Sequence, residues 1–137
     1  MILLDTHVLL WLVMEDPRLG AAARDRIERT RRESPVYVPP IAFWEIGMNI
    51  SKRRFALGRP LRDWTASVLA VRNVFLAPFD ETIAIDAAEL ADGLHGDPAD
   101  RIIIATARAL ACPLVTADQR INDYAARGHL QAIDARR

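Results

Sequence analysis

The sequence has one cysteine, one lysine, no excess charge of either sign and no long apolar run. The single cysteine, Cys112, excludes an internal disulfide and is typical of proteins kept in a reducing compartment. Eighteen basic residues balance 18 acidic ones, so any attraction to nucleic acid must be local. No apolar stretch is long enough to cross a bilayer, and no basic leader precedes the first residues. We therefore expect a cytoplasmic protein without a membrane segment.

The 137 residues suit one domain, which we expect to span residues 1–137. Short apolar runs alternate with segments of helical spacing. Strands are expected at residues 1–4, 36–38, 74–79, 114–116 and 130–133. Helices are expected at residues 7–13, 21–33, 41–53, 60–72, 81–92, 98–111 and 118–127. This alternation predicts an α/β fold, in which a mostly parallel sheet of about five strands is covered by helices on both faces.

Four carboxylates stand where this pattern turns from strand to helix or lies early in a helix. Asp5 ends the first apolar run, and Asp118 follows the run at 114–116. Glu45 lies in the expected helix 41–53, and Asp100 follows Asp97-Pro98, a typical helix start. Ligands of parallel sheets bind beyond the carboxyl ends of the strands, so these acids are expected to converge there. Four such acids would repel one another unless a divalent cation neutralised them, and oxygen ligands favour Mg²⁺ or Mn²⁺.

Each acid also has an ordinary explanation. Asp5 and Asp118 can cap the helices that follow them, Asp100 can complete a capping-box-like start with Asp97, and Glu45 can be an exposed helix charge. Their joint placement favours the metal site. The three histidines lack metal-ligand spacing, and the chain has no nucleophile elbow or phosphate-binding glycine loop.

The densest basic patch lies at residues 52–62 and contains Arg53, Arg54 and Arg59. These residues are candidates for contact with phosphate, or they provide favourable charge after the end of a helix. Both interpretations stay open at this point.

The tryptophans Trp11, Trp44 and Trp64 each fall on an apolar helical face. This position predicts core or interface anchors rather than platforms for base stacking. The helix at 60–72, with Trp64, can form either a surface groove or ordinary core.

Four segments, in the same order and with similar spacing, resemble the PIN-domain ribonucleases, and in particular the VapC-type toxins of type II toxin–antitoxin pairs. They are Leu3-Leu4-Asp5-Thr6-His7-Val8-Leu9-Leu10-Trp11, Trp44-Glu45-Ile46, the run from His95-Gly96-Asp97-Pro98-Ala99-Asp100-Arg101 to Ala107, and Leu114-Val115-Thr116-Ala117-Asp118. One departure is Pro39-Pro40-Ile41, where relatives often carry a serine or threonine cap.

The resemblance implies a three-layer α/β/α sandwich and metal-assisted hydrolysis of RNA. It places metal-binding, catalytic acids at Asp5, Glu45, Asp100 and Asp118, with Thr6, Asp97 and Thr116 in support. An ion held by Asp5 and Asp100 would lower the pKa of a bound water, so no histidine base is needed. The resemblance also implies a homodimer and a cognate antitoxin whose tail covers the active-site groove.

Two other interpretations were weighed. A phospho-accepting α/β domain would use Asp5 as its nucleophile, but the second acid expected two residues later is replaced by His7, and the only lysine, Lys52, lies in a helix. A non-catalytic module that binds RNA or a partner is compatible with the same fold. The presence of all four acids argues against it.

Overall fold

The computed structural model describes residues 1–94 and 96–137, so His95, which belongs to one of the motifs above, lies outside the described residues. Within the described residues, five strands form one parallel sheet in the order β3-β2-β1-β4-β5. The strands are β1 (Ile2–Leu4), β2 (Val36–Val38), β3 (Val74–Leu76), β4 (Leu114–Thr116) and β5 (Ala132–Asp134). The expected α/β fold with a sheet of about five strands is confirmed.

Seven helices accompany this sheet in the described part of the chain. They are α1 (Thr6–Val13), α2 (Ala21–Glu33), α3 (Pro40–Ser51), α4 (Leu61–Leu69), α5 (Glu81–Ala88), α6 (Pro98–Leu110) and α7 (Gln119–Ala126). The strand expected at 74–79 ends at Leu76, because only Ala77 continues the pairing, through its N–H to the Val38 carbonyl, and Pro78 has no N–H to donate. The α3 helix begins without a side-chain cap, and Pro40 occupies a first-turn position that tolerates proline.

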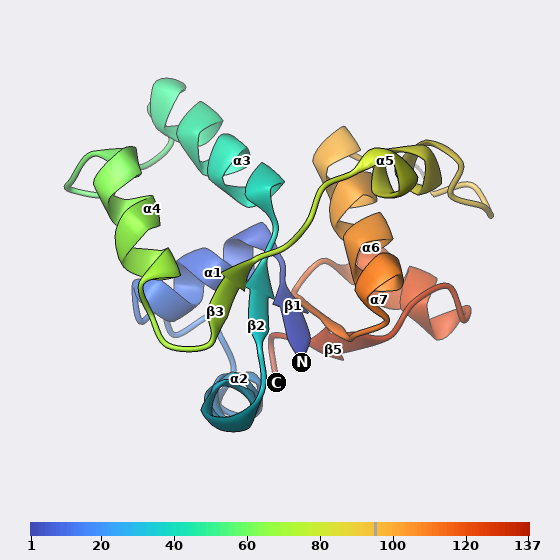
Figure 1. Cartoon of the computed structure of the whole chain (residues 1–137), viewed down its shortest axis with the longest axis horizontal. Coiled ribbons are helices and arrows are strands. Elements are labelled where there is room, and N and C mark those ends of the chain that lie inside the picture. Colours follow the sequence, from blue (N-terminus) through green and yellow to red (C-terminus); the bar gives the residue numbers. More distant parts are fainter. Residues whose placement is uncertain (95) are drawn as a thin grey trace.

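Alternate side chains of the strands point to opposite faces of the sheet and build two cores. Ile2 and Leu4 join the core formed with α1, α2, α3 and α4. Leu3 joins the second core, which is formed mainly with α6 and α7. The α5 helix packs on α6, so it lies outside that layer. Figure 1 shows α1, α2 and α4 on one side of the sheet and α5, α6 and α7 on the other.

The strand order places β1 at the centre, where the direction of the chain through the sheet reverses. The chain moves outward from β1 to β2 and β3 and then returns to β4 on the other side of β1. The crevice at such a reversal is where open parallel sheets bind ligands. Helix α3 begins beyond the carboxyl end of β2, runs away from the sheet and contacts both α1 and α6 (Figure 1).

The three tryptophans have three different environments. Trp64 is only 3% exposed and belongs to the core, so Trp64 itself lines no surface groove, whereas Phe55 and Leu57 line a cavity. Trp44 is 57% exposed on α3. Trp11 is half-buried at the edge of the first core. Helical periodicity predicted an apolar face for each residue but not what covers that face.

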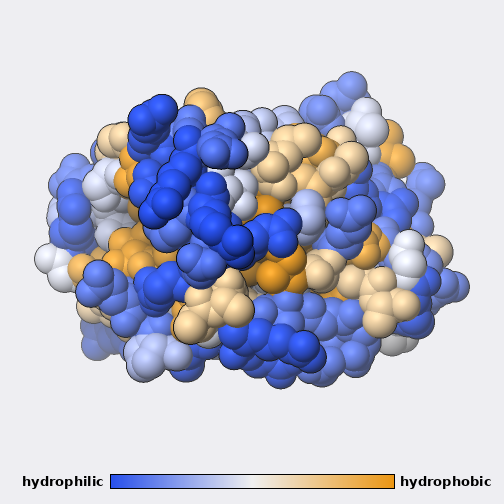
Figure 2. Space-filling model, turned by 90° about the horizontal axis from the view of Figure 1, so that it is seen from below, coloured by the Kyte–Doolittle hydropathy of each residue, from blue (hydrophilic) through white to orange (hydrophobic). Residues whose placement is uncertain are grey.

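The surface seen from below in Figure 2, on the side of the amino ends of the strands, is mostly hydrophilic, with apolar residues gathered across its middle. In residues 1–94 and 96–137, no helix has the length and apolar character that crossing a membrane requires.

Candidate metal centre

Asp5 lies directly after β1, at the carboxyl end of the central strand. It is 5% exposed, and both of its carboxylate oxygens accept hydrogen bonds. Oδ1 accepts from the Thr6 backbone N–H at 2.7 Å, and Oδ2 accepts from Thr116 Oγ1 at 2.6 Å. The backbone N–H of Asp5 also donates to the Val115 carbonyl at 3.0 Å, which continues the β1–β4 pairing up to the acid. The carboxylate is therefore held rigidly at the switch point.

Glu45 approaches the same place from the middle of α3. The Thr6 hydroxyl donates a hydrogen bond of 2.6 Å to Glu45 Oε1. Thr6 is buried and begins α1, so it ties α3 to the residue that follows Asp5. Glu45 is half-buried, so it is not an exposed helix charge.

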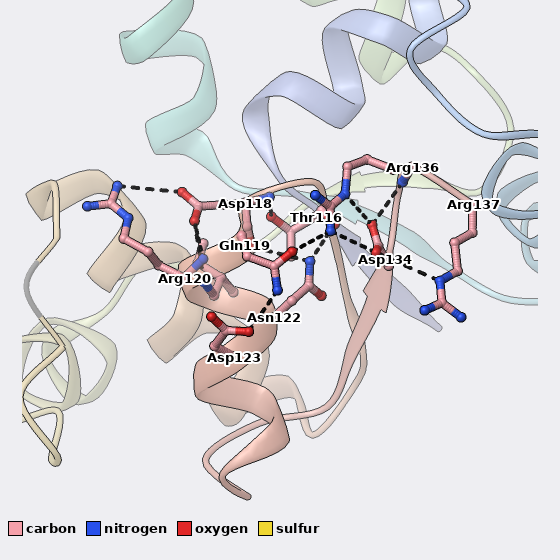
Figure 3. Close-up of polar contacts among 10 residues, drawn as sticks. Thr116, Asp118, Gln119, Arg120, Asn122, Asp123, Asp134, Arg136 and Arg137 are labelled. Atoms are coloured by element: carbon pink, nitrogen blue, oxygen red, sulfur yellow. Dashed lines mark hydrogen bonds and ion pairs between the residues drawn. The ribbon is translucent and has the colours of Figure 1, made fainter.

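Asp118 follows β4, the strand beside β1, and caps helix α7. Its Oδ1 accepts from the backbone N–H of Arg120 at 2.8 Å, and its own backbone N–H donates to Thr116 Oγ1 at 3.1 Å. Figure 3 shows Arg120 reaching back over Asp118, with 3.7 Å between Arg120 Nη2 and Asp118 Oδ2. Thr116 thus contacts two acids at once, since the hydroxyl that donates to Asp5 also accepts from Asp118.

Asp100 lies in the first turn of α6. Asp97 caps this helix through a 2.9 Å bond from the Ala99 backbone N–H, and Pro98 takes the first helical position. Asp97 therefore has a capping role at the start of α6. Asp100 makes no such capping bond and lines the cavity described next.

All four acids line one cavity of about 390 Å³ at the carboxyl edge of β1 and β4. The residues that line it are Asp5, His7, Trp11, Glu45, Asp97, Asp100, Ala117, Asp118 and Arg120. The sequence thus predicted correctly that the four carboxylates meet. It did not predict His7, Trp11 and Arg120, although the i, i+4 spacing of His7 and Trp11 just after Asp5 and the place of Arg120 two residues after Asp118 were available signals.

The cavity makes ionisation of the acids unfavourable. Burial, followed by the charges of Asp5, Asp118 and Glu45, raises the pKa of Asp100 to about 7. Burial also raises the pKa of Asp5, against the opposing effect of its bonds from Thr116 and Thr6. The pKa of Glu45 is raised by burial too, and the bond from Thr6 opposes that shift. A cluster with these shifts gains from a cation that neutralises it.

The four carboxylates are not yet arranged as a finished coordination sphere. Within the described part of the chain, no group of three or more histidine, cysteine or acidic side chains lies close enough together to hold a metal ion as placed. Uncompensated carboxylates repel one another, and several of their oxygens are occupied by Thr6, Thr116 and the α7 cap. Their chemistry suits a hard divalent cation, and binding one requires small side-chain movements.

The three arginines that are candidates for phosphate contact lie in different places. Arg54 lines a second cavity, which adjoins the acids and is described below, and its Nη1 donates to Asn49 Oδ1 at 3.1 Å. Arg53 and Arg59 are exposed. All three follow the end of α3, so both interpretations of this patch remain compatible with the structure.

Comparison with known proteins agrees with this geometry. The family model described as the PIN domain matches residues 2–127. Over 124 residues the chain is 34% identical to Ribonuclease VapC22 of Mycobacterium tuberculosis, covering 90% of this chain and 91% of that protein.

Two solved structures share the fold at low sequence identity. One is VapBC2 from Rickettsia felis bound to a DNA fragment from their promoter, with a TM-score of 0.72, 17% identity and 98% of each chain covered. The other is a toxin–antitoxin complex from Klebsiella pneumoniae, with a TM-score of 0.64, 20% identity and 98% of each chain covered. With nearly the whole chain matched by the family model and by a ribonuclease relative, and with the acids gathered at the switch point of a parallel sheet, this protein belongs to the PIN domain family.

Proposed function

We propose that this protein is the toxin of a type II toxin–antitoxin pair and acts as a Mg²⁺- or Mn²⁺-dependent endoribonuclease. The observation that carries the proposal is the single cavity lined by Asp5, Glu45, Asp100 and Asp118. The relative named Ribonuclease VapC22 supports RNA as the substrate. A direct test is cleavage of a single-stranded RNA pool by the purified protein with Mg²⁺, compared with the same reaction in excess chelator.

The four acids would hold the metal in this proposal, with Asp5 and Asp100 as the principal ligands. A bound divalent ion supplies an activated water for attack on the phosphorus and positive charge for the leaving oxygen. Asp5 contributes a carboxylate that Thr6 and Thr116 keep in one orientation. Such supporting hydrogen bonds fix ligands in a site and limit how far they must move.

Asp100 has a pKa raised to about 7, so its protonation state can change near neutral pH. Without a cation, the raised pKa of Asp100 keeps much of this carboxyl group protonated at neutral pH, which limits repulsion from Asp5. Loading a cation would release that proton. A histidine base would not be needed, because a cation held by these acids would lower the pKa of the attacking water.

Two other interpretations are less well supported: a phospho-accepting domain and a non-catalytic binding module. An aspartyl nucleophile is opposed by His7, which stands where a second acid is expected, and by Lys52, which caps the end of α3 instead of following a strand. A non-catalytic module on the same fold would not cut RNA in the presence of Mg²⁺, so the cleavage assay separates it from the enzyme.

We propose as partner a cognate antitoxin whose tail covers the active-site groove. The support is the likeness to a solved structure titled as a toxin–antitoxin complex. We further propose that residues 1–137 act as one domain in the cytoplasm, where the buried free thiol of Cys112 stays reduced.

We also propose a homodimer, formed through an apolar edge rather than through the helix of Trp64. Six large apolar residues on α3, on β3 and on the segment through α5 are between 38% and 57% exposed. This apolar edge consists of Trp44, Met48, Phe75, Leu76, Phe79 and Ile85. Strand β3 pairs only with β2, so its outer side is open to a second copy.

A further inference from the structure

A second cavity, of about 610 Å³, opens beside the acid cavity and shares four lining residues with it. The shared residues are His7, Trp11, Glu45 and Asp97. The other lining residues that matter here are Arg18, Asn49 and Arg54, and we name the whole the aromatic cavity. The two cavities therefore adjoin, and a chain lying across the acids can continue into the second one.

The lining of the aromatic cavity includes three flat groups, the Trp11 and His7 rings and the Arg18 guanidinium. The Arg18 guanidinium lies over the Trp11 ring, 5.1 Å from its centroid, and the His7 ring is tilted by 56° at 6.2 Å. Asp16 holds Arg18 in place, with bonds of 3.1 Å from Nε and 2.7 Å from Nη2. Tryptophan and arginine planes are the surfaces on which unpaired bases stack.

Asn49 and Arg54 add polar and charged groups to the lining of the aromatic cavity. Arg54 donates to Asn49 Oδ1, which uses the oxygen of this amide and leaves its NH₂ to donate to a ligand. An amide of this kind can read the edge of a base, and the Arg54 guanidinium can meet a phosphate. Neither group is needed to bind a cation, so the cavity has a chemistry distinct from that of the acids.

We infer that the aromatic cavity is a nucleotide subsite, which holds a base next to the scissile phosphate of single-stranded RNA. The base stacks against Trp11 and Arg18, Asn49 donates to its edge, and Arg54 contacts the adjoining phosphate. The subsite would set which nucleotide stands beside the cut. This inference rests on the proposed ribonuclease function and adds the position and chemistry of its sequence preference.

The test is cleavage of a random single-stranded RNA pool with Mg²⁺, followed by sequencing of the product ends. Trp11→Ala and Asn49→Ala should each weaken the base preference at one position beside the cut by at least about fivefold. Phe43→Ala is the matched control, because Phe43 is also a half-buried aromatic residue packed on the first core, and it lines neither cavity. It should keep the wild-type preference. Thermal melts confirm that each variant is folded, and Asn49→Ala serves if Trp11→Ala is not.

Cleavage with an unchanged preference in both variants would overturn the subsite and leave the ribonuclease function standing. The same holds if these variants lose only antitoxin binding, because the cavity would then serve a protein segment. If the wild-type protein does not cut RNA, the proposed function fails, and the subsite is judged by binding. The Trp11 indole N–H signal in NMR, assigned with Trp11→Phe, should then shift on titration with short single-stranded RNA, and an unmoved signal would overturn the subsite.

Discussion

Thr116 Oγ1 donates a 2.6 Å hydrogen bond to Asp5 Oδ2 across 111 residues of sequence. The same hydroxyl accepts from the backbone N–H of Asp118, so one buried threonine orients acids that follow two neighbouring strands. The pairing of β1 with β4 creates this contact, and it places the site at the point where the strand order reverses.

Thr116→Val should lower Mg²⁺-dependent RNA cleavage about 10- to 100-fold, because Asp5 loses the partner that orients it. The measure is kcat/KM together with the concentration of Mg²⁺ giving half-maximal rate, which should rise. Thr106→Val is the control. Thr106 is also buried, but its hydroxyl donates to the Ile102 carbonyl inside α6, away from the acids. Equal losses of activity in both variants would contradict a positioning role for Thr116.

Metal-free protein should become less stable as the pH rises from about 4 to about 7. The folded protein binds a proton at Asp100 up to a pKa of about 7, whereas an unfolded aspartate loses it near 3.8, so folding is disfavoured progressively over that interval. Over this pH range, we expect the Tm of Asp100→Asn to fall by about 3–6 °C less than the Tm of the wild-type protein. Melts in chelator across this range test the prediction. A wild-type decline no steeper than that of the variant would contradict it.

Replacing Arg53, Arg54 and Arg59 with Gln should weaken RNA binding and reduce the dependence of binding on salt. Each lost phosphate contact removes about 0.7 from the slope of log K against log salt for a single strand. Arg26, Arg29 and Arg32 of α2 provide a triple variant with the same change in net charge. If both triple variants have the wild-type slope, the basic residues after α3 only stabilise the end of that helix.

Phe75→Glu should convert the dimer to a monomer, because it buries a charge in the proposed apolar edge. Light scattering at micromolar concentration measures the mass. Val13→Glu, at an exposed apolar residue of α1 outside that edge, should remain dimeric. A wild-type protein that is monomeric, or a Phe75→Glu variant that stays dimeric, would show that the apolar edge is not the interface.

The sequence predicted most of the fold because local signals determined it. Asp97-Pro98 marked the start of α6, and the continuous apolar runs marked the buried strands β1 and β4. Predictions were weakest at the ends of elements: β3 is shorter than expected, β5 (Ala132–Asp134) is displaced by two residues at its start, and α5 ends at Ala88 instead of residue 92.

The convergence of the acids was also predictable, because it follows from strand order. The sequence did not predict how deeply each helix that carries a tryptophan is buried. Trp64, Trp44 and Trp11 show similar periodicity, yet one is core, one is exposed and one borders the cavities. Only the packing of α4, α3 and α1 against other elements separates these cases. The hydroxyl of Thr116 bonding two acids likewise depends on a contact between distant segments.

The most direct test of the metal centre is Asp100→Asn, measured by RNA cleavage and by melts with and without Mg²⁺. Asp80→Asn is the control, since Asp80 caps α5 through the Ile83 backbone N–H and lies outside the acid cavity. Asn keeps the size of Asp and still caps a helix, so a capping role for Asp100 would leave activity unchanged. We predict that Asp100→Asn stays folded, loses at least ~100-fold in cleavage and gains little stability from Mg²⁺, because even residues that only support metal ligands cost 10- to 100-fold. A variant that still cuts RNA at the wild-type rate and is still stabilised by Mg²⁺ would contradict the assignment of Asp100 to the metal site.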